Sequence, residues 1–297
     1  MATKHKGSKR SKRAKKPKSA VKRSTRTSLS IATNASKKVK ERVAAMAAAP
    51  LAVCESDKDL QAMLNVLRNE EEAVEVRMAA LQALGAAAFS VIAFESCHAD
   101  YIATLRQVST DPNPKIRSRV LGILVRNKDG FAQKKLLDGL KNPDKALVPP
   151  EKALQLLGYD AHTEAYPIAR KIIDAPPNPQ ARREAVRLLA ADAKSAPLFE
   201  KLLRDKAELR EIRQISASAL QSLRPEKMLE HAREILLDKS DYNDIKATSL
   251  TALEQFGDGG ALEKDKPLLK SVGRFRAREG PAKYKQSARR FLRKFDR

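Results

Sequence analysis

Apolar residues recur along the middle of the chain in a short pattern that repeats at intervals in the low thirties. Each copy opens on an anchor residue, followed by small or apolar residues at positions +3 and +4 and usually by a leucine at +7. The anchors are Arg77, Arg117, Pro150, Arg182, Arg213 and Lys246, at spacings of 40, 33, 32, 31 and 33 residues. Positions +3, +4 and +7 share one face of a helix, and repeats of this length are typical of stacked helical hairpins.

Each unit is predicted to consist of two helices joined by a polar turn. In the second unit, Ile102, Leu105 and Val108 lie on one face of a helix, and the helix breaker Asp-Pro-Asn-Pro at 111–114 follows them. A second helix then opens near Arg117. The same order returns in the later units, so helical hairpins are expected to fill the middle of the chain.

The first interval is longer than the other four. It spans 40 residues, against 31 to 33 for the rest. We place the additional residues between Gly85 and Tyr101, because the apolar pattern is regular on either side of that segment.

Paired leucines, an Asp or Asn turn, Val/Ile-Arg and then Ala-Leu-Leu resemble the repeats of the HEAT family. The resemblance covers roughly residues 59–256. It implies an all-α fold, a right-handed α-solenoid of about six to seven hairpins, whose function is to hold other molecules. In that family the turn aspartate and the following arginine form a ladder of hydrogen bonds between units. The matching pairs here are Asp111 with Arg117, Asp205 with Arg213, and Asp238 with Lys246.

The net charge of +23 is concentrated at the two ends of the chain. Residues 1–50 contain 16 Lys or Arg and one acid, and residues 264–297 contain 13 and three. The segment 51–263 has a net charge of −2. This asymmetry favours nucleic acid or another polyanion as a partner of the ends.

Composition divides the chain into four segments. We expect a disordered basic tail over residues 1–36, a helix and linker over 37–58, the repeat solenoid over 59–260 and a basic capping unit over 261–297. The tail has twelve Lys or Arg, which repel one another, no acid, and few large apolar residues. Little burial of apolar surface is therefore available to offset the entropy cost of ordering it.

A cluster of cations in the tail predicts phosphate contacts that do not depend on base sequence. It comprises Lys9, Arg10, Lys12, Arg13, Lys15 and Lys16. Three alternatives stay open: a tail that only solubilises the chain, a nuclear import signal in a host with a nucleus, and a mitochondrial transit peptide.

The last segment predicts an amphipathic helix. Its apolar stripe consists of Tyr284, Ala288, Phe291, Leu292 and Phe295. The cations expected to bind nucleic acid are Arg289, Arg290, Arg293 and Lys294. A capping helix is compatible with this binding function, and attachment to a membrane surface is a further alternative.

The second helices of the hairpins are expected to bind a protein or peptide. Positions +2, +5 and +9 from an anchor point away from the buried set. They nominate a contact patch of Arg119, Arg126, Lys152, Gln155, Tyr159 and Arg187. This surface is close to neutral, which favours a protein partner over nucleic acid; the oligomeric state is left open.

No residues were found that would support catalysis. Deoxyhypusine hydroxylases are built from similar repeats and hold iron with His-Glu pairs, but none of the four histidines here precedes a glutamate. Tryptophan, which the helical-repeat DNA glycosylases place around a lesion, is absent. The chain is therefore expected to be a non-catalytic scaffold without cofactor or metal. The alternative is a nucleic-acid-processing enzyme of the glycosylase type.

Cys54 and Cys97 lie far apart in the sequence and suggest no disulfide. Cys97 precedes His98, but no second Cys/His pair completes a metal site. The longest apolar stretch, Val43 to Cys54, is too short to span a membrane. We therefore expect a cytoplasmic protein, with association with DNA left open, or a nuclear one in a eukaryotic host.

Overall fold

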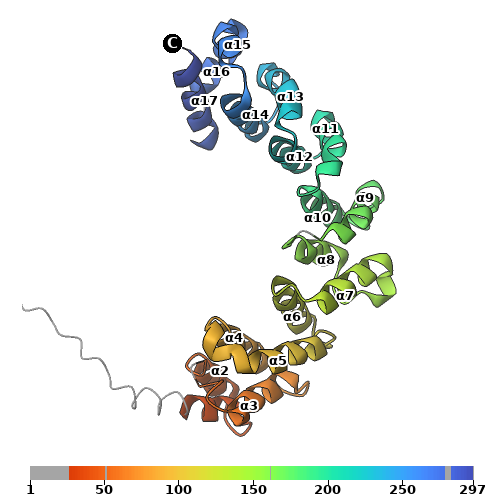
Figure 1. Ribbon diagram of the computed structural model, residues 1–297, viewed down its shortest axis with the longest axis vertical. Coiled ribbons are helices and arrows are strands. Elements are labelled where there is room, and N and C mark those ends of the chain that lie inside the picture. Colours follow the sequence, from red (N-terminus) through yellow and green to blue (C-terminus); the bar gives the residue numbers. More distant parts are fainter. Residues whose placement is uncertain (1–26, 51, 161, 278–281, 297) are drawn as a thin grey trace, which may run out of the picture. The chain divides into compact units, whose positions relative to one another are not determined.

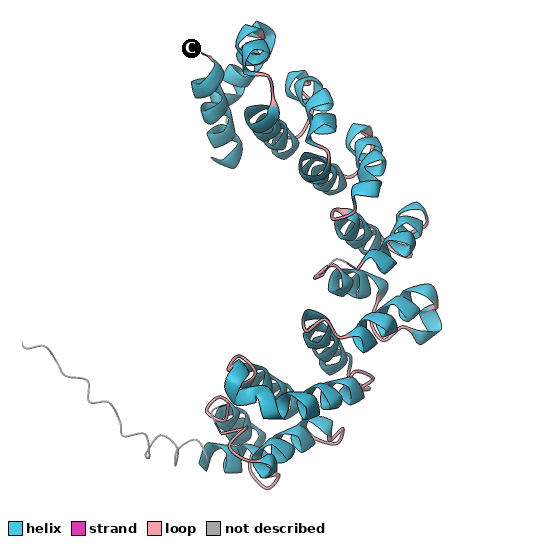
Figure 2. Cartoon of the chain, in the orientation of Figure 1, coloured by secondary structure: helices cyan, strands magenta, loops and turns pink. Residues whose placement is uncertain are grey.

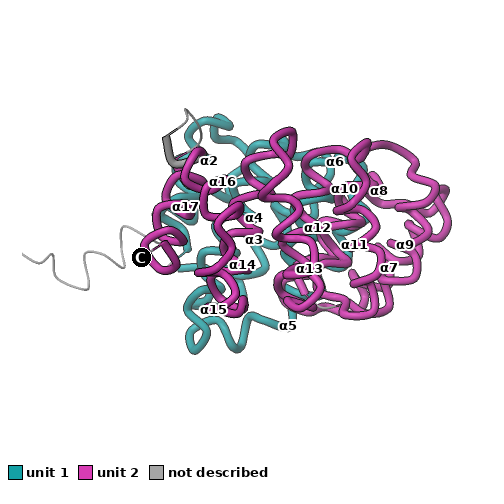
Figure 3. The backbone as a smooth tube through the Cα atoms, turned by 90° about the horizontal axis from the view of Figure 1, so that it is seen from above, with its two compact units in different colours: residues 1–124 teal, residues 125–297 magenta. Residues whose placement is uncertain are grey.

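The computed structural model describes residues 27–50, 52–160, 162–277 and 282–296. Every regular element in these ranges is helical (Figures 1 and 2), which confirms the all-α prediction. The chain forms two compact units, residues 1–124 and 125–297 (Figure 3).

Unit 1 consists of helices that pack on one another. Its helices are α2 (Val39–Met46), α3 (Asp57–Arg68), α4 (Val74–Ala87), α5 (Val91–Val108) and most of α6 (Pro114–Arg126). Helix α3 packs on both α4 and α5, and α2 packs on α4.

Residues 27–33 are also helical, although the sequence analysis placed them in the tail that it expected to be disordered. Leu29 and Ala32 are buried, and Nε of Arg42 donates a 3.1 Å hydrogen bond to the carbonyl of Ala32. This short stretch is ordered because its apolar residues have a surface to pack on. Residues 1–26, which carry all twelve basic residues of the tail, lie outside the described residues.

Unit 2 contains a series of helical pairs. The first helix of each pair is α7 (Gly130–Lys141), α9 (Tyr166–Asp174), α11 (Ala196–Arg204) or α13 (Pro225–Leu237). The second helix is α8 (Pro150–Leu157), α10 (Pro179–Leu189), α12 (Arg210–Leu223) or α14 (Asn243–Phe256). The chain continues through α15 (Gly259–Lys264), α16 (Lys266–Ala277) and α17 (Ala282–Phe295). Short 3-10 turns follow α7, α8 and α10, at Pro143–Lys145, Thr163–Ala165 and Ala193–Ser195.

Second helices pack on one another in chain order. Helix α10 contacts α8 and α12, α12 contacts α14, and α14 contacts α17, so these five helices form one row within unit 2 (Figure 1). The first helices cover the other side of the row, and α13 also packs on α16. The apolar set predicted from each anchor is buried: Ala185, Val186 and Leu189 after Arg182 are fully inaccessible to solvent.

Local sequence explains where these helices begin. The side chain of Asn178 accepts a 2.7 Å hydrogen bond from the backbone N–H of Ala181, and Pro179 follows at the first helical position. Asp129 caps α7 in the same way through Ala132, at 3.0 Å. Such caps satisfy N–H groups that have no partner within the helix.

Anchor arginines form a ladder of hydrogen bonds between consecutive helical hairpins, but their partners are not the ones that the HEAT resemblance implied. Nε of buried Arg213 donates to the carbonyl of Leu203 at 2.9 Å, and both terminal nitrogens donate to Asp241 at 2.9 Å. Arg77 repeats this arrangement with Leu67 and Asp111. Each guanidinium therefore reaches an acid in the next turn along the chain.

The expected pairs are corrected accordingly. Arg117 donates to the backbone carbonyl of Asp111 at 2.6 Å, while the Asp111 carboxylate pairs with Arg77. Asp238 pairs with Lys206, at 2.8 Å, and not with Lys246, which is nevertheless buried. The carboxylate of Asp205, expected to pair with Arg213, accepts from its own turn at the N–H of Ala207.

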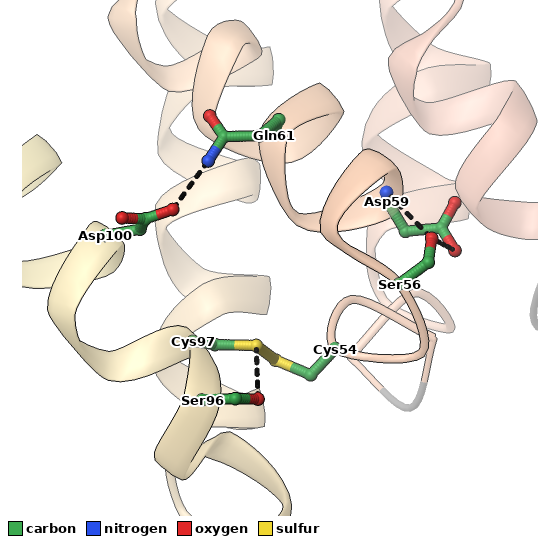
Figure 4. Close-up of a disulfide and its surroundings, with 7 residues drawn as sticks. All are labelled: Cys54, Ser56, Asp59, Gln61, Ser96, Cys97 and Asp100. Carbon is green, nitrogen blue, oxygen red and sulfur yellow. Dashed lines mark hydrogen bonds between the residues drawn. A yellow bond between two sulfur atoms is a disulfide. The ribbon is translucent and has the colours of Figure 1, made fainter.

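The extra residues of the first interval lie in α5 and in the short connection between α4 and α5. Phe89, Val91 and Ile92 in this segment are among the most exposed apolar side chains of the protein. Cys97 lies on the same helix and forms a disulfide with Cys54, which precedes α3 (Figure 4). The prediction that the two cysteines form no disulfide is therefore wrong, and the cysteines no longer support an intracellular location.

The apolar stripe predicted near the end of the chain lies on a helix, α17, as expected. Tyr284, Ala288, Phe291, Leu292 and Phe295 of α17 are all buried. They form one apolar cluster with α14 and α16, through residues such as Leu250, Leu268, Leu269 and Val272. This apolar face of α17 therefore contributes to the core of unit 2.

Candidate functional site

A polar surface extends over the exposed faces of α12 and α14, two neighbouring second helices. Three side-chain pairs bridge the helices, each joining residues 34 positions apart. They are Arg210 with Asp244 at 3.0 Å, Gln214 with Thr248 at 3.0 Å, and Gln221 with Gln255 at 3.1 Å. The repeat period places these partners opposite each other.

A groove of about 430 Å³ lies on this surface, between α12, α14 and α17. It is lined by Arg210, Gln214, Ser218, Gln221, Asn243, Asp244, Ala247, Thr248, Thr251 and Tyr284. We call it the α12–α14 groove. Most of its side chains are amides and hydroxyls, which donate and accept hydrogen bonds without net charge.

One acceptor in the groove has no hydrogen bond within the described part of the chain. The amide nitrogen of Gln214 is bound by Thr248 and Ser218, whereas its buried Oε1 has no donor. A buried carbonyl oxygen left without a donor costs about 1–3 kcal/mol.

Ion pairs link the turn that precedes α14 to Arg213 of α12 and to Lys206. Burial alone would raise the pKa of Asp241, but hydrogen bonds from Arg213 and Lys206 hold that pKa below its ordinary value. Hydrogen bonds from Lys206 and Ser240 likewise depress the pKa of Asp238. These carboxylates stay charged at neutral pH and fix the start of α14.

The predicted protein-contact patch is exposed or half-buried throughout. On α8, Lys152 donates to Gln155 at 2.8 Å, and Tyr159, just beyond the helix, lies under the guanidinium of Arg126, 5.8 Å from the ring centroid. Arg119, on α6, belongs to unit 1, whereas the other five residues belong to unit 2.

Arg187, the last member of that patch, is already engaged. It pairs with Glu184 on its own helix and with Glu211 on α12. The structure therefore brings Arg126 and Tyr159 together and assigns Arg187 to a bridge between second helices.

Sequence reasoning missed the residues of the α12–α14 groove. The rule that nominated positions +2, +5 and +9 also selects three groove residues, Ser218 after Arg213, and Thr248 and Thr251 after Lys246. The contact patch was drawn from the second, third and fourth repeats, so these positions of the fifth and sixth repeats were not singled out. The signal was the recurrence of small polar residues one repeat apart.

The predicted nucleic-acid contacts divide into two sets. Lys9, Arg10, Lys12, Arg13, Lys15 and Lys16 lie outside the described residues. Arg289, Arg290, Arg293 and Lys294 are exposed on α17. Of these four, Arg290 pairs with Glu254 at 3.0 Å, and Lys294 donates to the carbonyl of Glu254 at 2.6 Å.

One group of residues has the composition of a metal site. Potential ligand atoms of Glu200, Glu230 and His231 lie within 4.8 Å of one another. However, His231 contacts Glu200 at 2.8 Å, and its hydrogen bond lowers the pKa of that carboxyl. Lys227 binds both oxygens of Glu230 at 2.9 Å. Both carboxylates are already compensated, so we assign no metal here.

No protein-family model matches the sequence, and no curated protein is significantly similar to it. Among the helices of the described ranges, none combines the length and the apolar character needed to cross a bilayer.

Proposed function

We propose that the chain is a HEAT-like α-solenoid that acts as a non-catalytic scaffold and binds a protein partner along its second helices. Its basic termini bind nucleic acid without sequence specificity. The row of second helices in unit 2 and the ladder of anchor arginines support the solenoid assignment.

The α12–α14 groove is the observation that carries the protein-binding function. Its lining residues on α12 and α14 carry side-chain donors and acceptors, among them the amides of Gln214 and Gln221 and the hydroxyl of Thr251. An extended peptide presents N–H and C=O groups along its backbone, and these match such a lining. A flat apolar ligand would leave the amides of the groove without partners.

Peptide display against the full chain tests this proposal. Peptides selected on the wild type should lose at least about tenfold in affinity for Ser218→Trp, because an indole placed at the exposed Ser218 fills the groove. Lys201→Trp, on the exposed face of α11, is the matched control and should bind like the wild type.

Equal binding by wild type and Ser218→Trp would move the peptide site away from the groove. Release of bases from alkylated duplex DNA by the purified chain would instead support an enzyme of the glycosylase type and contradict a scaffold without catalysis.

A further inference from the structure

Helix α16 carries a row of cations that the sequence analysis did not single out. Lys266, Lys270 and Arg274 are four residues apart and exposed. At a rise of about 1.5 Å per residue, successive members lie about 6 Å apart along the helix. None of the three makes an ion pair or a side-chain hydrogen bond to another described residue.

The row lies opposite the buried face of α16. Leu268, Leu269 and Val272 pack into the apolar cluster of the capping unit. Residues four apart share a helix face, and Leu268, Leu269 and Val272 occupy the opposite face. The cations therefore point away from the apolar core of unit 2. The α16 row is thus held at a fixed position by its buried side.

Helix α17 packs on α16 and adds a second row. Arg289 and Arg293 are exposed and four residues apart, and neither is paired with another described residue. Their neighbours Arg290 and Lys294 are turned to Glu254. Two adjacent helices therefore carry five exposed cations whose charge no described acid compensates.

We propose that these two rows form a folded binding surface for the phosphate backbone of a nucleic-acid duplex, with Lys266, Lys270 and Arg274 as its centre. This inference rests on the proposed binding of nucleic acid by the termini and assigns it a second, ordered site besides the tail. Lysine and arginine at regular intervals on rigid helices suit successive phosphates.

The burial of apolar side chains argues for nucleic acid against the other anionic partners. A helix that lies in a membrane surface needs an exposed apolar face, and the apolar residues of α17 are buried in the cluster. A protein interface normally has apolar or aromatic side chains at its centre, and no large apolar side chain is exposed in the described parts of α16 and α17.

The test compares two triple variants of the full chain. K266Q/K270Q/R274Q removes the α16 row, and K134Q/K141Q/K145Q removes three exposed lysines elsewhere in unit 2 as a matched control. Anisotropy of a labelled 20-base-pair duplex is followed from about 50 to 200 mM salt. Melting by circular dichroism checks that both variants fold.

We expect the slope of log affinity against log salt to fall by about 0.9 for each phosphate that the variant no longer neutralises, hence by up to about 2.7 for the α16 variant. Its affinity at 100 mM salt should fall about tenfold or more, while the control keeps a slope within about one unit of the wild type. K266R/K270R/R274K keeps the charges and should restore binding.

If the wild type binds the duplex and the α16 variant matches the lysine control, the surface is not used, although the proposed function of the termini stands. If the wild type does not bind the duplex, both proposals fail. Equal losses of affinity for polyglutamate or for anionic lipid vesicles would overturn the assignment to nucleic acid.

Discussion

The side chain of Arg213 is 2 % exposed, yet it is fully engaged by hydrogen bonds. Nε binds the carbonyl of Leu203, and the two terminal nitrogens bind Asp241 in the turn that precedes α14. Removing a guanidinium from water is costly, and the geometry of this bidentate pair offsets that cost. Arg213 thereby joins its own hairpin to the next one.

Replacing this buried arginine should lower the free energy of unfolding far more than replacing an exposed arginine. Arg213→Met leaves the carboxylate of Asp241 buried with Lys206 as its remaining cation, so we expect a loss of about 3 kcal/mol in the free energy of unfolding. Urea denaturation measures it. Arg204→Met, on the exposed end of α11, should change stability by less than about 0.5 kcal/mol. Similar losses for both variants would contradict a structural role of the pair.

The same acids make stability depend on pH. Hydrogen bonds from Arg182 hold the pKa of Glu208 below its ordinary value, as those from Arg213 and Lys206 do for Asp241 against the opposing effect of burial. A carboxyl with a depressed pKa in the folded state stabilises the protein above its unfolded pKa, which is near 4, and this contribution is lost as the pH falls through the folded value.

We therefore expect the melting temperature to be nearly constant from about pH 7 to 5 and to fall steeply below about pH 4. Circular dichroism melts across this range provide the measurement. Asp241→Asn should be less stable than the wild type at pH 7 and should lose less between pH 5 and 3, because one of the titrating groups is gone. A wild-type melting temperature that rises on acidification would show the opposite sign.

At the scale of elements, helix type and order followed from the apolar periodicity, whereas the partners of each residue did not. The +3, +4 and +7 positions after Arg182 are buried as predicted. The ladder pairs were carried over from the resemblance to the HEAT family, which matches each anchor with the aspartate that precedes it in the chain. In the structure, the acid that Arg213 binds lies 28 residues downstream, where only the packing of consecutive hairpins places it.

The disulfide was missed for the same reason. Cys54 and Cys97 are separated by 43 residues, and their Cα atoms lie 6.3 Å apart because α5 packs on α3. Gln61 of α3 and Asp100 of α5 form a 2.7 Å hydrogen bond beside them (Figure 4). No periodicity in the sequence indicates this meeting, which depends on the lengthened α5.

We predict that the oxidised protein has no free thiol and that reduction exposes two. A crosslink closing a loop of this length stabilises the folded state by up to about 4 kcal/mol through the entropy of the unfolded chain. The double variant C54S/C97S should therefore melt at a lower temperature than the oxidised wild type and be insensitive to dithiothreitol. Thiol titration under denaturing conditions, with and without reductant, checks the bond. Two free thiols in protein purified without reductant would exclude it.

At the scale of the whole molecule, charge and structure are distributed differently along the chain. The segment 51–263, which holds most of the repeats, has a net charge of −2, and most of the +23 lies in the tail and the capping unit. Composition alone could predict this separation, because it needs only counting. It could not predict which cations are held by acids, as Arg290 is by Glu254, and which remain exposed, as Lys270 does.

The tail can be removed at two positions with different expected results. Deletion of residues 1–26 removes twelve Lys or Arg and leaves Leu29 and Ala32 in place, so the melting temperature should be unchanged. Deletion of residues 1–36 also removes the carbonyl that Arg42 binds and should destabilise unit 1 by about 1–3 kcal/mol.

Both deletions should weaken binding to unrelated duplexes to a similar extent, because residues 27–36 contain no cation. If the tail engages about 6–10 phosphates, the affinity of the full chain should fall about 10³–10⁵-fold between 50 and 200 mM salt, and that of the shortened chains much less. Residual binding should then depend on α16 and α17. A salt titration that gives the same slope for the full chain and for the chain lacking residues 1–26 would show that the tail makes no phosphate contacts.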